Sequence, residues 1–136
     1  MKQLKIILLF ALILTVSSIE AKPLKTNSVY IFGFSASFKD SVIYVTDIQN
    51  VQEAWIETKN EFLLGRDQYS YQLKTYLADS LSQPDRVCLV IFALKKKKAE
   101  KMYLKLMKKY KKGYEVRYLN AREFKFDAID MSPDNQ

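Results

Sequence analysis

The chain of 136 residues contains no histidine, one cysteine and only three glycines. Without histidine it lacks the commonest general base and transition-metal ligand of proteins. The single cysteine, Cys88, excludes an internal disulfide bond and a zinc site built from cysteines. Three glycines leave no room for a glycine-rich loop around a phosphate group. We therefore predict no catalytic residue, no metal site and no cofactor, and we interpret Cys88 as a buried, inert thiol within an apolar strand.

The chain is rich in apolar residues, at 49%, and in aromatic residues, at 13%, which is enough for one domain with a substantial core. Residues 1–21 combine a positively charged start, an apolar stretch and a small-residue end, the organisation of a secretory signal peptide. We therefore predict a cleaved signal peptide at 1–21, a linker at 22–28, a single α+β domain at 29–129 and a disordered tail at 130–136. The protein is expected to be exported, either to the periplasm or as a secreted protein.

The stretch of residues 87–118 organises the rest of the domain. Residues 87–93 are apolar and mostly β-branched or aromatic, which predicts a strand covered on both faces. Residues 95–112 are rich in lysine and stop at Gly113, the pattern of a helix with a glycine after its last turn. Residues 114–118 alternate between apolar and charged side chains, as in a half-exposed strand. We expect the two strands to be parallel and to be joined by the helix in a crossover.

Further elements complete the predicted fold. Residues 29–34 are apolar and predict a central strand, residues 42–45 a second strand, and residues 122–126 an edge strand. A helix is expected from Asp67, whose side chain would cap it, with an apolar stripe of Tyr69, Leu73, Tyr76, Leu77 and Leu81. Residues 47–64 show no clear period. The order β-β-α-β-α-β predicts an α+β fold, a two-layer sandwich of a mixed four- to five-stranded sheet and two helices, of ferredoxin-like type.

Positive charge is concentrated in the predicted helix. Residues 95–112 carry ten lysines against one acid, Glu100, a net charge of +9, whereas the whole chain has +7. At 3.6 residues per turn, an arc of about 100° is apolar and an arc of about 120° on the opposite side is basic. The apolar arc consists of Ala99, Met102, Tyr103, Leu106 and Tyr110. The basic arc, which we call the lysine face, consists of Lys97, Lys98, Lys101, Lys105, Lys108, Lys109 and Lys112.

The lysine face has two interpretations. It is either a solvated surface that keeps the protein soluble, or a contact surface for a polyanion. Suitable partners are anionic lipid headgroups, an acidic envelope polymer or an acidic protein, whereas nucleic acid fits the charge but is unlikely for an exported protein. Tyr71 and Tyr118 are the tyrosines least needed by the core. We expect a non-enzymatic envelope protein that acts as a binding or interaction module; the sequence does not indicate its oligomeric state.

A small hydrolase that uses carboxylates is the alternative from another class. It would need two of the acids between residues 40 and 67 to converge in a cleft. These acids are Asp40, Asp47, Glu53, Glu57, Glu61 and Asp67, and their spacing singles out no pair. Ser35 and Ser37 lack the Gly-x-Ser-x-Gly turn of a nucleophilic serine, and no histidine is present to activate them. Solvation of the surface, or docking beside the lysine helix, is the favoured interpretation of the acids.

The whole chain, with residues 33–34 at a strand end, the break at residues 64–67 and the lysine helix, resembles a family of small exported bacterial proteins of unknown function. This resemblance implies a location but no chemistry. The succession of strand, helix, Gly-Tyr and strand over residues 87–116, with the opening strand at residues 30–35, also resembles the peptidoglycan-binding SPOR domain. That resemblance covers about half of the mature chain and implies glycan binding as an alternative function. The chain departs from the SPOR pattern at residues 42–45, where a strand is expected in place of the first helix.

Overall fold

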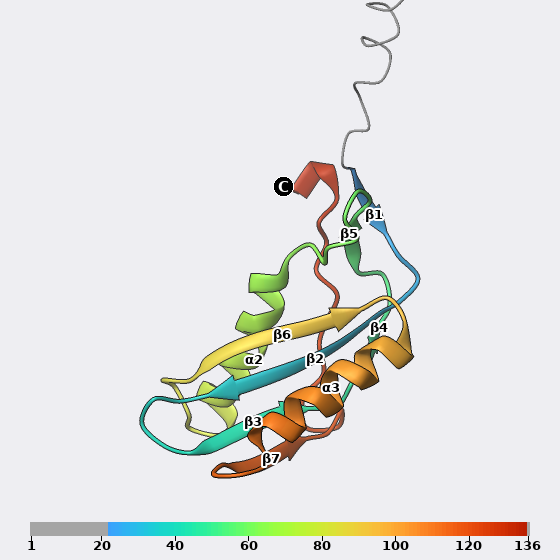
Figure 1. Cartoon of the computed structure of the whole chain (residues 1–136). Helices are drawn as coiled ribbons and strands as arrows, with labels where there is room; N and C mark the ends of the chain where they lie inside the picture. Colours follow the sequence, from blue (N-terminus) through green and yellow to red (C-terminus); the bar gives the residue numbers. More distant parts are fainter. Residues whose placement is uncertain (1–21, 136) are drawn as a thin grey trace, which may run out of the picture.

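The computed structural model describes residues 22–135, so the signal peptide predicted for residues 1–21 lies outside the described residues. The centre of the molecule is a five-stranded mixed sheet (Figure 1). Its strands are β2 (Val29–Ala36), β3 (Val42–Thr46), β4 (Gln49–Val51), β6 (Val87–Ala93) and β7 (Glu115–Leu119). β6 pairs antiparallel along one side of β2, and β3 and β4 pair antiparallel along its other side. β7 pairs parallel with β3, so β2 is central, as its apolar sequence predicted.

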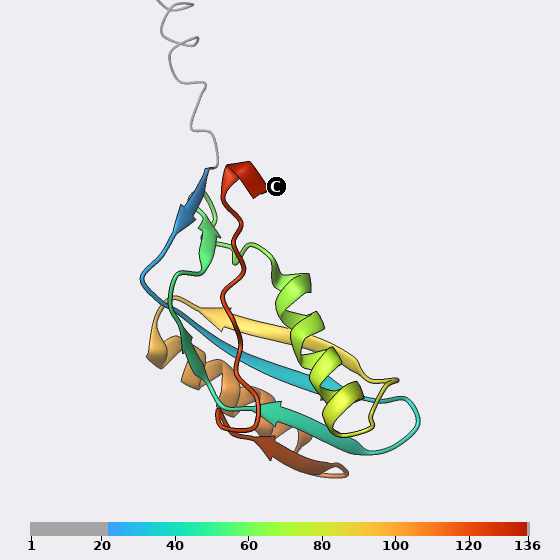
Figure 2. The same ribbon diagram turned by 180° about the vertical axis from the view of Figure 1, so that it is seen from behind.

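The two helices lie on opposite faces of the sheet. α3 (Lys96–Tyr110) is in front of it in Figure 1, and α2 (Arg66–Ser80) is in front in the reverse view of Figure 2. β2 is buried on both faces, because Ile31 packs with the α2 cluster and Phe34 with the α3 cluster. The predicted α+β class, with a mixed sheet and two helices, is confirmed. The layers number three rather than the predicted two, since an apolar strand needs a cover on each face.

The N-cap of α2 lies two residues before the predicted Asp67, and no side chain caps the helix. Gly65 occupies the N-cap position in the left-handed region, with φ of 77°, and Asp67 lies in the first turn. The predicted apolar stripe is confirmed at Tyr69, Leu73 and Leu77, which are fully buried. The helix approaches β2 closely at Gly33, where an added Cβ would lie 2.7 Å from Leu73 Cδ2. Glycine at this position therefore sets the distance between α2 and the sheet.

The predicted linker at residues 22–28 contains a strand. β1 (Pro23–Lys25) pairs antiparallel with β5 (Trp55–Glu57), and the two form a separate small sheet. The backbone N–H of Thr26 extends the pairing by donating to Ala54 O at 2.8 Å. Three-residue strands are too short to produce a recognisable alternation, which explains why β1, β4 and β5 escaped prediction. The small sheet orders the part of the chain whose sequence showed no clear period.

The C-terminal segment is not the predicted edge strand. After a turn at residues 121–123, residues 124–132 run without regular secondary structure beside α2, shown in red in Figure 2, and bury Phe124 and Phe126 against the sheet. Side chains supply several of its backbone hydrogen bonds: Gln49 Nε2 donates to Phe124 O at 2.9 Å, and Phe126 N donates to Gln49 Oε1 at 2.8 Å. Gln72 binds the backbone of Asp127 in the same way. The alternating aromatic residues therefore reflect burial of one side of the segment, without pairing in the sheet.

The last described residues also differ from the predicted disordered tail at residues 130–136. A short 3₁₀ helix, η1 (Pro133–Asn135), follows a turn in which Asp130 accepts hydrogen bonds from Ser132 N and Asn135 Nδ2. Gln136 lies outside the described residues. Local side-chain hydrogen bonds of this kind order short segments that carry no apolar pattern.

β6 lies at an edge of the sheet, although its sequence predicted a strand covered on both faces. Val87 is 50% exposed and Leu89 is 41% exposed, and Cys88 is half-buried rather than buried. β6 and β7 run in the same direction, as predicted, but β2 and β3 separate them and α3 crosses over both. An apolar run indicates a preference for burial, whereas the position of a strand in the sheet depends on long-range pairing.

Candidate functional site

All seven residues of the lysine face are exposed; six of them lie on α3, and Lys112 follows the end of the helix. None of them forms an ion pair with another residue in the described part of the chain, where the four ion pairs involve other residues. Lys109 Nζ lies 5.5 Å from the centre of the Tyr110 ring. The lysine face is therefore a surface of one charge sign on α3 and the residues directly after it.

The packing of α3 on the sheet fixes the direction of the lysine face. Ala99 is fully buried, the ring of Tyr103 meets Phe32 edge to face at 5.3 Å, and the ring of Tyr110 lies 4.9 Å from Phe34. These contacts hold the apolar side of the helix against the sheet. The lysines, on the opposite side of a 3.6-residue period, consequently point to solvent.

A groove runs beside the lysine face, between α3 and β7. Its volume is about 580 Å³, and it is lined by Tyr103, Leu104, Met107, Lys108, Lys111, Tyr114, Val116 and Tyr118. Leu104 is 67% exposed and Tyr118 is 60% exposed, so the lining offers apolar and aromatic surface to a ligand. We call this feature the α3–β7 groove. Lys108 belongs both to the groove and to the lysine face, which makes the two surfaces continuous.

Sequence reasoning missed the α3–β7 groove, although it identified Tyr118 as a tyrosine not needed by the core. The available signal was Leu104, which follows Lys101 by three residues and precedes Lys108 by four, at the flank of the lysine face. Burial, assisted by the nearby Tyr118 and Asp47, raises the pKa of Tyr103 above its ordinary value. Tyr103 therefore keeps its hydroxyl proton at neutral pH and adds no negative charge to the groove.

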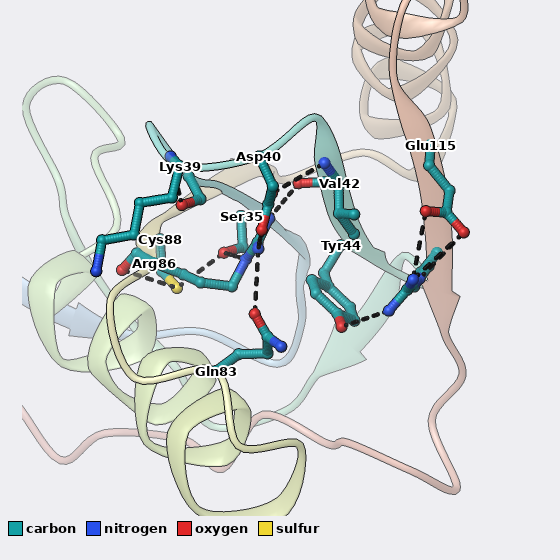
Figure 3. A network of polar contacts seen from close by, with 11 residues as sticks. Ser35, Lys39, Asp40, Val42, Tyr44, Gln83, Arg86, Cys88 and Glu115 are labelled. Carbon is teal, nitrogen blue, oxygen red and sulfur yellow. Dashed lines mark hydrogen bonds and ion pairs between the residues drawn. The ribbon is translucent and has the colours of Figure 1, made fainter.

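A second polar cluster surrounds Arg86 and joins β6 to the β2–β3 hairpin (Figure 3). Arg86 is almost fully buried; its Nε donates to Ser35 Oγ at 3.2 Å, and its Nη2 donates to the carbonyl oxygen of Val42. The guanidinium also lies 3.4 Å from Asp40 Oδ1 and 4.8 Å from the centre of the Tyr44 ring. These contacts tie Arg86 to β2, to β3 and to the turn between them, so we interpret the cluster as a structural joint.

Cys88 belongs to this cluster. Its thiol donates to Ser35 Oγ at 3.4 Å. Burial raises the pKa of the Cys88 thiol, against smaller opposing effects of Ser35, Lys74 and Arg86. A thiol with a raised pKa is a weak nucleophile at neutral pH, which agrees with the inert character predicted from the sequence.

The six acids of the hydrolase alternative have separate environments. Asp40 binds Arg86, Asp47 accepts from the N–H of Ala121, and Glu53 lies 3.6 Å from Lys25. Glu57 is in β5, Glu61 lies beside the end of β6, and Asp67 is in the first turn of α2. No two of the six line the same hollow described here. Within residues 22–135, no group of three or more acids and cysteines could hold a metal ion.

The chain matches no protein-family model, no curated protein and no solved structure. No helix within residues 22–135 has both the length and the apolar character needed to span a membrane.

Proposed function

We propose that this protein is a non-enzymatic binding module of the bacterial envelope that contacts a polyanion through the lysine face. The observation that carries the proposal is the set of seven exposed lysines without an ion pair among the described residues. Charges of one sign on a fixed surface add up to a potential that attracts a polyanion, whereas interspersed acids would cancel it. The proposal includes export of the protein, with residues 1–21 as a signal peptide.

The α3–β7 groove supports the same proposal. Anionic lipids and acidic polymers present apolar or carbohydrate surface next to their charges. The exposed side chains of Leu104, Tyr114 and Tyr118 offer contacts of this kind beside Lys108 and Lys111. An interface that combines lysines with tyrosine and leucine is typical of proteins that bind the surface of an anionic bilayer. The lysine face supplies attraction over distance, and the groove supplies short-range contact.

The test is a charge-removal series. Changing Lys101, Lys105 and Lys108 to Gln removes three charges from the lysine face, and each change should alter the free energy of unfolding by no more than about 0.5 kcal/mol. Binding to vesicles with anionic lipid, measured by co-sedimentation at low salt, should fall steeply. Binding of the unchanged protein should also weaken with added salt, because exposed charges are screened beyond about 8 Å at physiological ionic strength.

A matched control removes the same charge elsewhere. Lys59, Arg122 and Lys125 are exposed and lie outside α3, so their change to Gln should leave most of the binding intact. Equal losses in the two triple variants would mean that net charge alone matters. If the unchanged protein and the lysine-face variant bind equally weakly, the lysine face does not bind a polyanion and serves only to keep the protein soluble.

Glycan binding is the second candidate, because Tyr103, Tyr114 and Tyr118 line one groove. The faces of sugar rings pack on aromatic side chains, which provide large apolar contact area and a polar hydroxyl. Under this alternative, Tyr118→Ala would weaken binding to peptidoglycan fragments more than the lysine-face variant does. The reverse order would favour the polyanion.

A further inference from the structure

The lining of the α3–β7 groove combines exposed apolar side chains with charge of one sign. Leu104 and Tyr118 are more than half exposed, and Tyr114 is 45% exposed. The charged residues of the lining are Lys108 and Lys111, and no acid is among them. In four other hollows on residues 22–135, the lining includes at least one acid. The surface of this groove therefore suits a partner that presents apolar groups next to negative charge.

Leu104 lies beside the lysines of α3 and away from the core. At about 100° per residue, its side chain is about 20° around the helix from Lys97 and about 40° from Lys108. Ala99, which is fully buried against the sheet, is about 140° away. The position of Leu104 on the helix therefore directs it to the same surroundings as the lysines.

The other wall of the groove comes from β7. Val116 packs with the residues of α3, and Tyr118, two residues later in the strand, lies on the same side of the sheet. β7 is at the edge of the sheet, so Tyr118 is next to solvent. Glu115 of this strand forms an ion pair with Arg117 at 3.3 Å, which offsets its charge. Leu104 and Tyr118 thus form one exposed apolar patch from two elements, with lysines around it.

The charge of the molecule is also distributed unevenly across the sheet. Residues 95–112, at and around α3, carry a net charge of +9. α2, on the opposite face, carries two basic and two acidic residues, and residues 124–132 beside it carry one basic and two acidic residues (Figures 1 and 2). An anionic surface therefore attracts the α3 side and not the α2 side, which orients the whole molecule.

We propose that the partner of the α3–β7 groove is the surface of an anionic lipid bilayer, and that Leu104 and Tyr118 enter the boundary between its headgroups and acyl chains. This inference rests on the proposed function and names its polyanion. A tyrosine has an apolar ring and a polar hydroxyl, which suit this boundary. The lysine stems cross apolar surface while their ammonium groups stay at the level of the lipid phosphates.

The apolar patch decides between the bilayer and a soluble acidic polymer. Both partners would be attracted by the lysine face, with a gain of roughly fivefold in binding for each lysine near an anionic membrane surface. A soluble polymer of charged groups would leave Leu104 in water, because it has no apolar interior. A bilayer removes the same side chain from water, and this transfer adds to the binding.

Binding to two probes tests the proposal. Co-sedimentation measures binding to vesicles of phosphatidylglycerol and phosphatidylcholine, and calorimetry measures binding to inorganic polyphosphate. Leu104→Gln should weaken vesicle binding about tenfold and leave polyphosphate binding unchanged. Tyr118→Gln is a second variant with the same expected pattern. Tyr71→Gln is the matched control, because Tyr71 is 68% exposed and lies on α2; it should change neither. Circular dichroism verifies that each variant is folded.

Fluorescence reports whether residue 104 enters the bilayer. Trp55 is the single tryptophan of the chain, so Trp55→Phe provides a background without this signal. In that background, Leu104→Trp should shift its emission to shorter wavelength when vesicles are added, and brominated lipids should quench it. Tyr71→Trp in the same background is the control and should show neither effect.

The outcomes separate this inference from the proposed function. If Leu104→Gln and Tyr118→Gln bind vesicles as well as the unchanged protein does, or if Trp at residue 104 stays in water, bilayer insertion is wrong while polyanion binding by the lysine face stands. Equal losses for vesicles and polyphosphate in Leu104→Gln would instead indicate a groove for an acidic polymer and also overturn the inference. If the unchanged protein binds neither probe, the proposed function itself is wrong.

Discussion

The side-chain oxygen of Gln49 accepts a hydrogen bond from the backbone N–H of Phe126 at 2.8 Å. Its side-chain nitrogen donates to Phe124 O, so one buried amide provides both bonds that a neighbouring strand would make. This pair attaches the C-terminal segment to β4, far from it in sequence.

Gln49→Leu should detach this segment from its anchor. The change leaves the Phe126 N–H and the Phe124 carbonyl without partners, and buried groups of this kind cost about 1–3 kcal/mol each. We expect the free energy of unfolding, measured by urea denaturation, to fall by about 2–4 kcal/mol. Gln52→Leu, at an exposed position nearby, is the control and should change it by less than about 0.5 kcal/mol. A small effect at residue 49 would contradict the anchoring role.

Gly33→Ala should destabilise the protein through crowding. The new Cβ would lie 2.7 Å from Leu73 Cδ2 and 3.1 Å from Phe126 Cζ, and overpacking of this kind costs about 1–3 kcal/mol. Combining it with Leu73→Val should cost less than the sum of the two single changes, because the smaller side chain makes room. Urea denaturation of the unchanged protein, the two single variants and the double variant measures this coupling. Strict additivity would show that crowding by Leu73 is not the cause.

The stability of the fold should decrease at alkaline pH through Tyr69. Burial raises the pKa of Tyr69, although the hydrogen bond from Ile129 N opposes the shift. In the unfolded chain the pKa of tyrosine is about 10. The unfolded state therefore loses this proton at lower pH than the folded state does. The stabilising contribution is complete below pH ~10 and is lost as pH rises from there through the folded pKa.

Tyr69→Phe tests this dependence. The variant loses the hydrogen bond with Ile129, worth about 1 kcal/mol, at all pH values. Its free energy of unfolding should then fall less steeply than that of the unchanged protein above pH ~10. Denaturation series at several pH values measure the two slopes, and the lysines contribute equally to both proteins. Parallel profiles would exclude Tyr69 as the titrating group.

Arg86→Met should loosen the joint between β6 and the β2–β3 hairpin. The variant removes the donor that binds Ser35 Oγ and Val42 O, and the two acceptors then lack a partner in a buried place. We expect a loss of about 2–4 kcal/mol in the free energy of unfolding. Arg117→Met is the matched control, because Arg117 makes its contacts at the surface. This change should lower the free energy of unfolding by less than about 1 kcal/mol. Similar losses in the free energy of unfolding for the two variants would contradict the role of Arg86 as a structural joint.

Much of the fold was predictable, because β2, β3, α2, β6, α3 and β7 each have a readable period. The missed parts depend on partners distant in the sequence. Phe124 and Phe126 alternate as in a strand, yet their backbone partner is the side chain of Gln49, which no local pattern indicates. The edge position of β6 likewise depends on which strands flank β2.

The candidate site likewise has one part that local sequence patterns predict and one part that depends on distant residues. The direction of the lysine face follows from the 3.6-residue period alone, so all seven lysines could be identified as exposed. The α3–β7 groove could not be identified, because Tyr118 reaches Leu104 only through the parallel pairing of β3 with β7. Local periodicity predicts on which side of a helix a side chain lies, whereas a surface formed by two elements can be identified only from the tertiary structure.

The central position of β2 has a consequence for the order in which the chain folds. β2 is among the first elements to be synthesised, yet its strand partner β6 and its two helical covers come from residues 66–110. Contacts between distant segments form slowly, because the intervening chain must lose its freedom before they contribute. A nascent chain that ends before residue 66 therefore exposes a strand that is apolar on both faces. We expect such intermediates to be bound by molecular chaperones and to be cleaved readily by proteases, until α3 and β7 are complete.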